Sequence, residues 1–327
     1  MSVTRRSCHI VSALKSPTLA EIGEDQLVAT LIRGLSSGPH VRVAAGDDCA
    51  VLGPPRAARW HLLKADALVE GVHFLPEADP RRIGWKALCR AISDVAAMGG
   101  LPEHALVTLA VHPEVELAWV ERLYTGLERA ARRFGVSIVG GETSRSPGPL
   151  FLNITLTGTV ERGRCVRRSG GKPGDALYVT GRLGGSIHGK HLDFIPRLAE
   201  ARWLTEHFRL HAMMDLSDGL GADLPRLAAA SGCGYDLGKV PATPGCSQEQ
   251  ALNDGEDYEL LFALDPKQGA RLETLWRQAF PKLRLSRVGQ LTGLLAAPPE
   301  PALPLPEPEP ANSLHTRHGF DHFAKRR

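Results

Sequence analysis

The sequence predicts an α+β fold made of two α+β domains. Apolar residues recur at helical spacing in some segments and alternate with polar residues in others, and the two kinds of segment follow one another irregularly. The 327 residues are enough for two sizeable cores, and 43% hydrophobic with 23% charged residues is ordinary for a globular protein. We predict four parts: a loose N-terminal extension at 1–22, a first domain at 23–162, a second domain at 163–297, and a proline-rich connector with a C-terminal tail at 298–327.

The first half contains three predicted helices and four predicted strands. Helical periodicity is clear at 79–100, where Asp79 is suited to cap the first turn and Pro80 to occupy the first helical position. The other two helices are predicted at 25–35 and 113–135. The strands are predicted at 61–68, 104–111, 136–141 and 150–160, the last with clear alternation.

The second half starts a new mixture of strands and helices after Arg162. Strands are predicted at 176–181, 212–216, 258–264 and 283–291. Helices are predicted at 195–208, at 222–232 and from Pro266 onward. The irregular order in both halves is what favours two α+β domains, with a boundary near 161–172.

Composition and charge exclude several classes of protein. The formal net charge of +3 is too small to predict binding to nucleic acid or to a membrane surface, and no apolar run reaches the ~18 residues of a membrane-spanning helix. The six cysteines are scattered without a C-x-x-C pair, which argues against zinc, iron–sulfur clusters and a disulfide framework. We therefore expect a reduced, cytoplasmic compartment.

One glycine-rich stretch imitates a phosphate-binding loop. Residues 184–190 read G-x-x-x-x-G-K, but the Ser or Thr that would hold Mg²⁺ is replaced by His191. Magnesium prefers oxygen ligands, and Pro196 argues against the long helix that such a loop should open. We predict that phosphates bind elsewhere.

Acidic residues recur in apolar, glycine-rich surroundings at the ends of predicted strands and the starts of helices. A buried carboxylate is costly unless it is paired or bound to a cation, and neighbouring glycines let the backbone approach a phosphate. Carboxylates that converge from distant segments would form an oxygen-lined site for Mg²⁺ carrying phosphates. The residues concerned are Asp47, Asp48, Asp66, Glu70, Asp94, Glu142, Asp215, Asp218, Asp223, Asp254, Glu256 and Asp257.

Each of these residues also has a simpler interpretation. A single aspartate, such as Asp218 in S-D-G, is often a helix cap or a turn residue. Tyr124 reads as a core or rim aromatic, His73 as a structural histidine, and Arg168 as a surface charge. The residues alone therefore leave a structural α+β protein open, and they favour magnesium-dependent phosphate chemistry only as a set.

Seven motifs in order carry a resemblance to a known family. The motifs are, in order, GDDCAVL, DALVEGVHF, GWKALCRAISDVAAMGG, IVGGETSR, RSGGKPGDALYVTG, MMDLSDGL and NDGEDYELLF. The resemblance runs from about Gly23 to Gln290, with a weaker echo in GFDHF. Together they resemble the thiamine-monophosphate kinase family, within the superfamily of aminoimidazole ribonucleotide synthetase and selenophosphate synthetase. The resemblance implies the fold type of that superfamily, with an N-terminal domain that binds ATP and Mg²⁺ and pairs with its twin in a homodimer.

The resemblance also assigns roles to individual residues. Several Mg²⁺ ions would bridge the phosphates of ATP and of the acceptor, held by catalytic aspartates and by Glu142, which stands where the family usually has aspartate. The catalytic set is Asp48, Asp66, Asp94, Asp215 and Asp218. The ATP-binding set is Tyr124, Gly141, Glu142, Arg168 and Ser217. The set around thiamine is His73, Glu256 and Phe320.

The implied reaction is direct, in-line transfer of the ATP γ-phosphoryl group to thiamine monophosphate, giving thiamine diphosphate and ADP. Two departures from the family pattern keep alternatives open. Lys64-Ala65 stands where the family has two hydroxyl-bearing residues, and Lys64 either replaces the charge of one ion or points away. The segment after Gly185 is shortened. A relative with another small-molecule acceptor and a nucleotide-binding protein without turnover are the alternatives; a selenophosphate synthetase is disfavoured because no reactive N-terminal cysteine motif is found.

Overall fold

The computed structural model describes residues 16–293 and His322, which fall into two compact units, residues 16–36 with His322, and residues 37–293. The first unit contains helix α1 (Leu19–Ile32), which is interrupted at Gly23, where φ is 73°. The backbone N–H and the hydroxyl of Thr18 both donate to Glu21 at the start of this helix. The helix begins inside the stretch 1–22 that we predict as an extension. The predicted connector and Phe320 lie outside the described residues.

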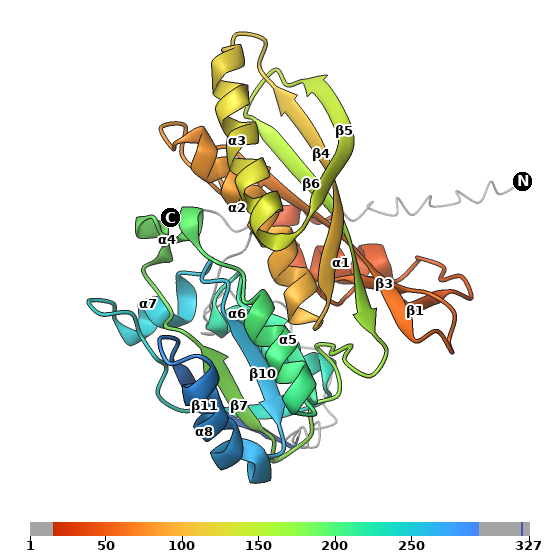
Figure 1. Cartoon of the computed structure of the whole chain (residues 1–327), viewed down its shortest axis with the longest axis vertical. Helices are drawn as coiled ribbons and strands as arrows, with labels where there is room; N and C mark the ends of the chain where they lie inside the picture. The colour runs from red at the N-terminus through yellow and green to blue at the C-terminus, as the bar shows by residue number, and fades with distance from the viewer. Residues whose placement is uncertain (1–15, 294–321, 323–327) are drawn as a thin grey trace, which may run out of the picture. The chain divides into compact units, whose positions relative to one another are not determined.

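The second unit contains a six-stranded sheet in the order β1-β2-β3-β6-β4-β5 (Figure 1). All neighbouring strands are antiparallel except β4 and β5, which are parallel. The four predicted strands of the first half are confirmed as β3 to β6, whereas β1 and β2 were missed. The strands are β1 (Val41–Val43), β2 (Ala50–Leu52), β3 (Arg59–Val69), β4 (Leu101–Val111), β5 (Ser137–Arg145) and β6 (Phe151–Glu161).

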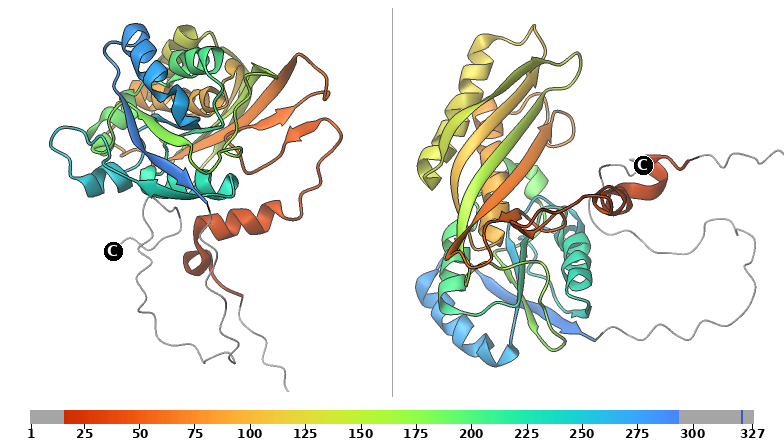
Figure 2. Two further views of the ribbon diagram at one scale, coloured as in Figure 1. Left: turned by 90° about the horizontal axis from the view of Figure 1, so that it is seen from below. Right: turned by 90° about the vertical axis from the view of Figure 1, so that its right-hand side faces the viewer.

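Helices α2 (Pro80–Ala97) and α3 (Leu117–Phe134) pack on one face of this sheet (Figures 1 and 2). Asp79 caps α2 as predicted, by accepting from the backbone N–H of Arg81. The helices cross closely because glycine stands at the crossing: a Cβ on Gly84 would lie 2.1 Å from the carbonyl oxygen of Leu123, and one on Gly126 only 1.9 Å from that of Arg81.

The opposite face of the same sheet is open within the described unit. Leu63 on β3, Leu106 on β4 and Val139 on β5 are 40%, 44% and 59% exposed. Alternation along each strand accounts for this, because Leu62 and Leu68 point to the helices and are buried while Leu63 points away. Among the described residues, no helix combines the length and apolar character that a membrane crossing requires.

A five-stranded sheet in the order β8-β10-β7-β11-β9 is covered on both faces. Helices α6 and α7 contribute to the core on one face, and α5 and α8 to an aromatic core on the other. Double coverage explains why β7 and β10 are buried at every position rather than alternating. The elements are β7 (Ala176–Thr180), α5 (Leu198–His207), β8 (Ala212–Asp215), α6 (Leu220–Ala230), β9 (Gly234–Leu237), α7 (Gln248–Asn253), β10 (Leu260–Leu264), α8 (Gly269–Ala279) and β11 (Leu285–Thr292).

Helix α2 belongs to both halves of this unit. Ile92 and Val95 lie in the core beneath the six-stranded sheet, whereas Ala96 and Ala97 lie in the aromatic core with α5 and α8. The C-terminal turns of α2 are therefore held between the two sheets, close to the end of β8. The sheets comprise residues on either side of 161–172, and the domain limits we gave remain a prediction.

Candidate active site

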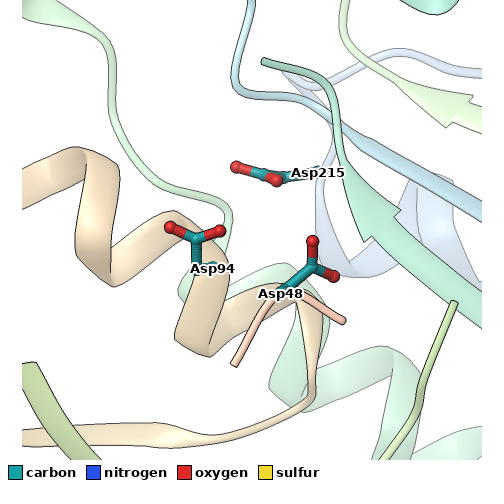
Figure 3. Close-up of side chains that lie close together, drawn as sticks. All are labelled: Asp48, Asp94 and Asp215. Carbon is teal, nitrogen blue, oxygen red and sulfur yellow. The ribbon is translucent and has the colours of Figure 1, made fainter. Parts of the chain in front are cut away.

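Three buried aspartates converge where the two sheets meet. One carboxylate oxygen each of Asp48, Asp94 and Asp215 lies within 4.8 Å of the others (Figure 3). Asp48 comes from the turn between β1 and β2, Asp94 from the C-terminal half of α2, and Asp215 from the end of β8. Residues almost 170 positions apart in the sequence thus form one group, as the acidic pattern predicts.

Neighbouring groups orient these three carboxylates. The Ser93 hydroxyl donates to Asp215 Oδ2 at 2.6 Å, and the backbone N–H of Asp48 donates to Asp47 at 3.0 Å. The backbone N–H of Cys49 is directed at the sulfur of Met98, just after α2, which ties the Asp48 turn to that helix. The site is therefore built on rigid elements rather than on a loose loop.

The electrostatics of the cluster call for a cation. Burial, together with the neighbouring Asp48, raises the pKa of Asp215 to about 7, and burial also raises the pKa of Asp94 well above its usual range. Within the described residues, no hydrogen-bond donor reaches the buried Oδ2 of Asp48. Three convergent carboxylates with one unsatisfied oxygen suit a hard divalent cation such as Mg²⁺.

Two cationic side chains already enter the cluster. The Lys64 ammonium donates to Asp94 Oδ1 at 2.8 Å, and the Arg168 guanidinium donates to Asp48 Oδ1 at 2.6 and 3.0 Å. Burial alone would lower the pKa of Lys64, but the Asp94 and Asp66 carboxylates outweigh it and raise the pKa. The question raised by Lys64 is thereby answered in this structure: its ammonium points into the cluster.

Two further predicted metal ligands lie outside the group of three and are paired with arginines. Asp66, on the same face of β3 as Lys64, forms an ion pair with Arg90 at 3.1 Å. Asp218, in the turn between β8 and α6, forms an ion pair with Arg226, and Ser217 Oγ lies 3.5 Å from its carboxylate. For either aspartate, a metal role would use the carboxylate oxygen that the arginine does not hold, or would exchange the arginine for the ion.

The structure does not bring Glu142 to the cluster. Register across β5, β4, β6 and β3 puts Glu142 in one row with Ala67, and so on the open face of the sheet, opposite to Asp66. Three strand spacings separate β5 from β3, roughly 14 Å. The metal and nucleotide roles of Glu142 thus remain predictions that one copy of the chain does not support.

Two more of the ATP-binding predictions, Gly141 and Tyr124, lie on β5 and α3. Gly141 neighbours Glu142, and a Cβ there would lie 1.8 Å from the carbonyl oxygen of Val107, so packing alone accounts for this glycine. Tyr124 on α3 is partly buried against the hydrophobic core, as its simpler interpretation predicts. Within the part of the chain that the structure describes, neither residue forms a hydrogen bond or ion pair with the three aspartates.

Two of the three residues assigned to the thiamine region, His73 and Glu256, belong to a second buried network. The fully buried Lys86 ammonium donates to Glu256 Oε2 at 2.7 Å and to the His73 carbonyl oxygen at 2.5 Å, and lies 2.8 Å from His191 Nδ1. Burial lowers the pKa of Lys86 to about 8. Glu256 adopts a left-handed backbone conformation, with φ at 52°. His73 Nδ1 accepts from the backbone N–H of Val69 at 2.9 Å.

In the glycine-rich segment 184–190, which imitates a phosphate-binding loop, backbone N–H groups donate to carboxylates of the same chain. The N–H of Gly184 donates to Asp257 and that of Gly185 to Asp254, at 2.9 and 2.7 Å. The helix that follows, α4 (Lys190–Asp193), has only 4 residues. Because the N–H groups of Gly184 and Gly185 are already used, the structure does not favour a phosphate cradle here, and phosphate binding elsewhere stays a prediction.

Sequence reasoning missed the basic residues that complete the site. Lys86 and Arg90 lie one turn apart on α2, and Arg226 lies on α6. The signal for the first two was present, because two basic residues interrupt the otherwise apolar face of a helix predicted to be buried. A buried lysine or arginine requires a carboxylate partner, and that requirement would have identified both.

Comparison with known proteins gives consistent matches. Residues 46–160 match the family model described as AIR synthase related protein, N-terminal domain. Thiamine-monophosphate kinase from Rhodopirellula baltica is 38% identical, covering 78% of this chain and 86% of that protein. The enzyme of the same name from Escherichia coli K12 is 35% identical, covering 92% and 98%.

Solved structures agree with these sequence matches. The crystal structure of thiamine monophosphate kinase from Aquifex aeolicus superposes with a TM-score of 0.68 at 30% identity, covering 81% of this chain and 93% of that one. AaThiL complexed with AMPPCP and TMP superposes with a TM-score of 0.73 at 31% identity, covering 85% and 93%. Structures of the hydrogenase maturation protein HypE share the fold at 19% identity. The chain therefore belongs to the thiamine-monophosphate kinase family, and its fold is the α+β fold of the aminoimidazole ribonucleotide synthetase-like superfamily.

Proposed function

We propose that this protein transfers the γ-phosphoryl group of ATP to thiamine monophosphate, giving thiamine diphosphate and ADP. The observation that carries the proposal is the convergence of Asp48, Asp94 and Asp215, with one buried oxygen unsatisfied, in a chain of this family. The AMPPCP and TMP in the AaThiL complex support the choice of ATP and thiamine monophosphate as substrates.

The chemistry requires alignment of two phosphates rather than a general base. A phosphate monoester has a second pKa of about 6, so its oxygen is largely deprotonated at neutral pH. The barrier is repulsion between two anions, which bound Mg²⁺ would reduce by neutralising and aligning both groups. This accounts for a site built of aspartates and basic side chains.

The acidic and the basic side chains of this site would have different roles. Asp48, Asp94 and Asp215 would hold Mg²⁺, with the Ser93 hydroxyl fixing the orientation of Asp215. Asp66 and Asp218 flank the cluster and would join it on release from Arg90 and Arg226. These arginines, with Arg168, then become available to phosphate oxygens, which guanidinium groups bind well.

The open face of the six-stranded sheet supports a homodimer. Its exposed apolar side chains on β3, β4 and β5 form a surface that a second copy would cover. Glu142 lies on this face, so it would bind a metal ion or nucleotide only at the interface between the two copies. We place the enzyme in the cytoplasm, and the described cysteines, which form no disulfide, fit that location.

The test is an assay of purified protein with ATP, Mg²⁺ and thiamine monophosphate, followed by mass spectrometry. We expect thiamine diphosphate and ADP in equal amounts. ADP with another phosphorylated product from a metabolite panel would favour the alternative acceptor. Binding of ATP without formation of ADP under any condition would favour a nucleotide-binding protein without turnover.

A further inference from the structure

We propose that Lys64 takes the place of one divalent cation in the Asp48–Asp94–Asp215 cluster. This chain would then bind one metal ion fewer than the same site with an uncharged residue at position 64. The inference rests on the proposed role of the cluster in metal binding, but it does not depend on the identity of the phosphate acceptor.

The position of the Lys64 ammonium is the first argument. Its Nζ lies 2.8 Å from Asp94 Oδ1, at the distance of a charge-assisted hydrogen bond, and the side chain is only 22% exposed. A metal ion would occupy the same space next to that oxygen. Lys64 and a metal ion therefore compete for one carboxylate oxygen, and the lysine holds it in this structure.

The backbone around Lys64 is the second argument, because it leaves the side chain no other direction. Lys64 lies in the middle of β3, where it pairs with Leu156 of β6. Alternation along β3 sends Lys64 and Asp66 to the helix-covered face, toward Asp94 on α2, while Leu63 and Ala65 point to the open face. The strand register thus directs the ammonium into the cluster.

The charge balance of the cluster is the third argument. The three aspartates receive the positive charges of Lys64 and Arg168, which leaves one negative charge in excess. One divalent ion more than offsets that excess, and a second would meet a repelling ammonium at Asp94. Replacement of Lys64 by an uncharged residue removes the repulsion and frees the Asp94 oxygen.

The experiment counts bound Mn²⁺ on the full chain without nucleotide or acceptor. Mn²⁺ prefers the same oxygen ligands as Mg²⁺, and its free concentration is read from the electron paramagnetic resonance signal. We expect K64T and K64M to bind one more Mn²⁺ per chain than the unchanged protein. K64R keeps the positive charge and should bind the same number as the unchanged protein.

A matched control comes from a second lysine in a carboxylate network. Lys190 lies 3.5 Å from both Asp257 and Glu259, outside the three-aspartate cluster, so K190M should leave the Mn²⁺ count unchanged. Equal counts for K64M, K64T and the unchanged protein would overturn the proposal, as would an equal gain in K190M.

Instability of the variants does not obscure the result. If K64M does not fold without metal, it is purified in Mn²⁺ and its tightly bound metal is counted by mass spectrometry after desalting, with K64Q as a second uncharged variant. An extra ion in both supports the proposal, and no extra ion in either contradicts it. Since thiamine monophosphate is absent, failure of the proposed kinase activity would be seen separately.

Discussion

Two groups of buried carboxylates in this molecule differ in how fully their oxygens are paired with hydrogen-bond donors. Around Gly184–Lys190, Asp257 accepts from the backbone N–H of Gly184, and Glu259 receives two guanidinium bonds from Arg197 at 2.6 Å and one from the Thr180 hydroxyl. At the other group, Asp48, Asp94 and Asp215 crowd together with one oxygen unsatisfied.

The comparison teaches how a ligand site differs from a structural network. The first group lies beside a sequence that imitates a phosphate loop, yet every acceptor named there has its donor in the chain. The second group has only scattered aspartates in the sequence, yet its negative charge exceeds what the chain supplies. Negative charge that the folded chain does not neutralise, rather than a glycine-rich motif, identifies the ligand site.

The largest effect is expected at the Asp48–Asp94–Asp215 group, whose negative charge exceeds the positive charge around it. Asp215→Asn should reduce turnover by at least about 10²-fold, because it removes a metal-binding charge from the site of phosphate transfer. The melting temperature should stay level or rise, because the substitution relieves repulsion by Asp48 and keeps an acceptor for Ser93. Steady-state kinetics and calorimetry on one preparation check both. Retained turnover with a large fall in melting temperature would assign Asp215 a structural role.

The same kind of substitution in the group around Gly184–Lys190 should lower stability and leave turnover nearly unchanged. Glu259→Gln leaves Arg197 with only the more distant Glu200 carboxylate, at 3.7 Å, and should cost about 3 kcal/mol of the free energy of unfolding. Denaturant unfolding measures that loss. Turnover per folded molecule should change little, and a Glu259→Gln variant that is stable but inactive would break the comparison.

A smaller effect is expected at His191, next to the loop. This residue lies 2.8 Å from Lys86 Nζ and 2.9 Å from Glu256, so His191→Ala should cost about 1–3 kcal/mol of stability. The affinity for ATP, measured by isothermal titration calorimetry, should stay nearly the same. A strong loss of ATP affinity would indicate that the phosphates of ATP bind at the glycine-rich loop.

The smallest effect concerns a compensated carboxylate near the surface. A hydrogen bond from Arg202, with help from Arg59, lowers the pKa of Glu161 from 4.5 to about 2. Its stabilisation is therefore complete above about pH 4.5 and is lost as the pH falls toward 2. Because Glu161 is 30% exposed, Glu161→Gln should cost only about 0.5–1 kcal/mol at pH 7.

The pH dependence of that cost is the control. Unfolding curves of the unchanged protein and of Glu161→Gln should converge as the pH falls from 4.5 to 2. A difference that stays constant over this range would show that the Glu161 ion pairs with Arg59 and Arg202 do not stabilise the fold.

Much of the fold could be predicted because its long elements carry strong patterns. Helix α2 has its cap and its apolar face in the sequence, and β6 shows clear alternation. Strands β1, β2 and β9 were missed because three or four residues are too few to show a period. The part of α1 before Gly23 was missed because the predicted helix begins only at residue 25.

The acidic residues of the site could be predicted from the sequence, but their ion pairs with basic residues could not. The apolar surroundings of Asp48, Asp94 and Asp215 are visible in the sequence, so their burial follows. The contact between Lys64 and Asp94 depends on how β3 packs against α2, which no local pattern specifies. The face to which Glu142 points depends on strand register, and its distance from β3 on strand order, both of which the sequence also leaves open.

The most direct test of the account is the location of the metal itself. Crystals grown with Mn²⁺ and a non-hydrolysable ATP analogue would show the ion by anomalous scattering. We predict the anomalous peak among the carboxylates of Asp48, Asp94 and Asp215, with the triphosphate beside it. A peak and a triphosphate at Gly184–Lys190, with the three aspartates still paired only to Lys64 and Arg168, would contradict the account.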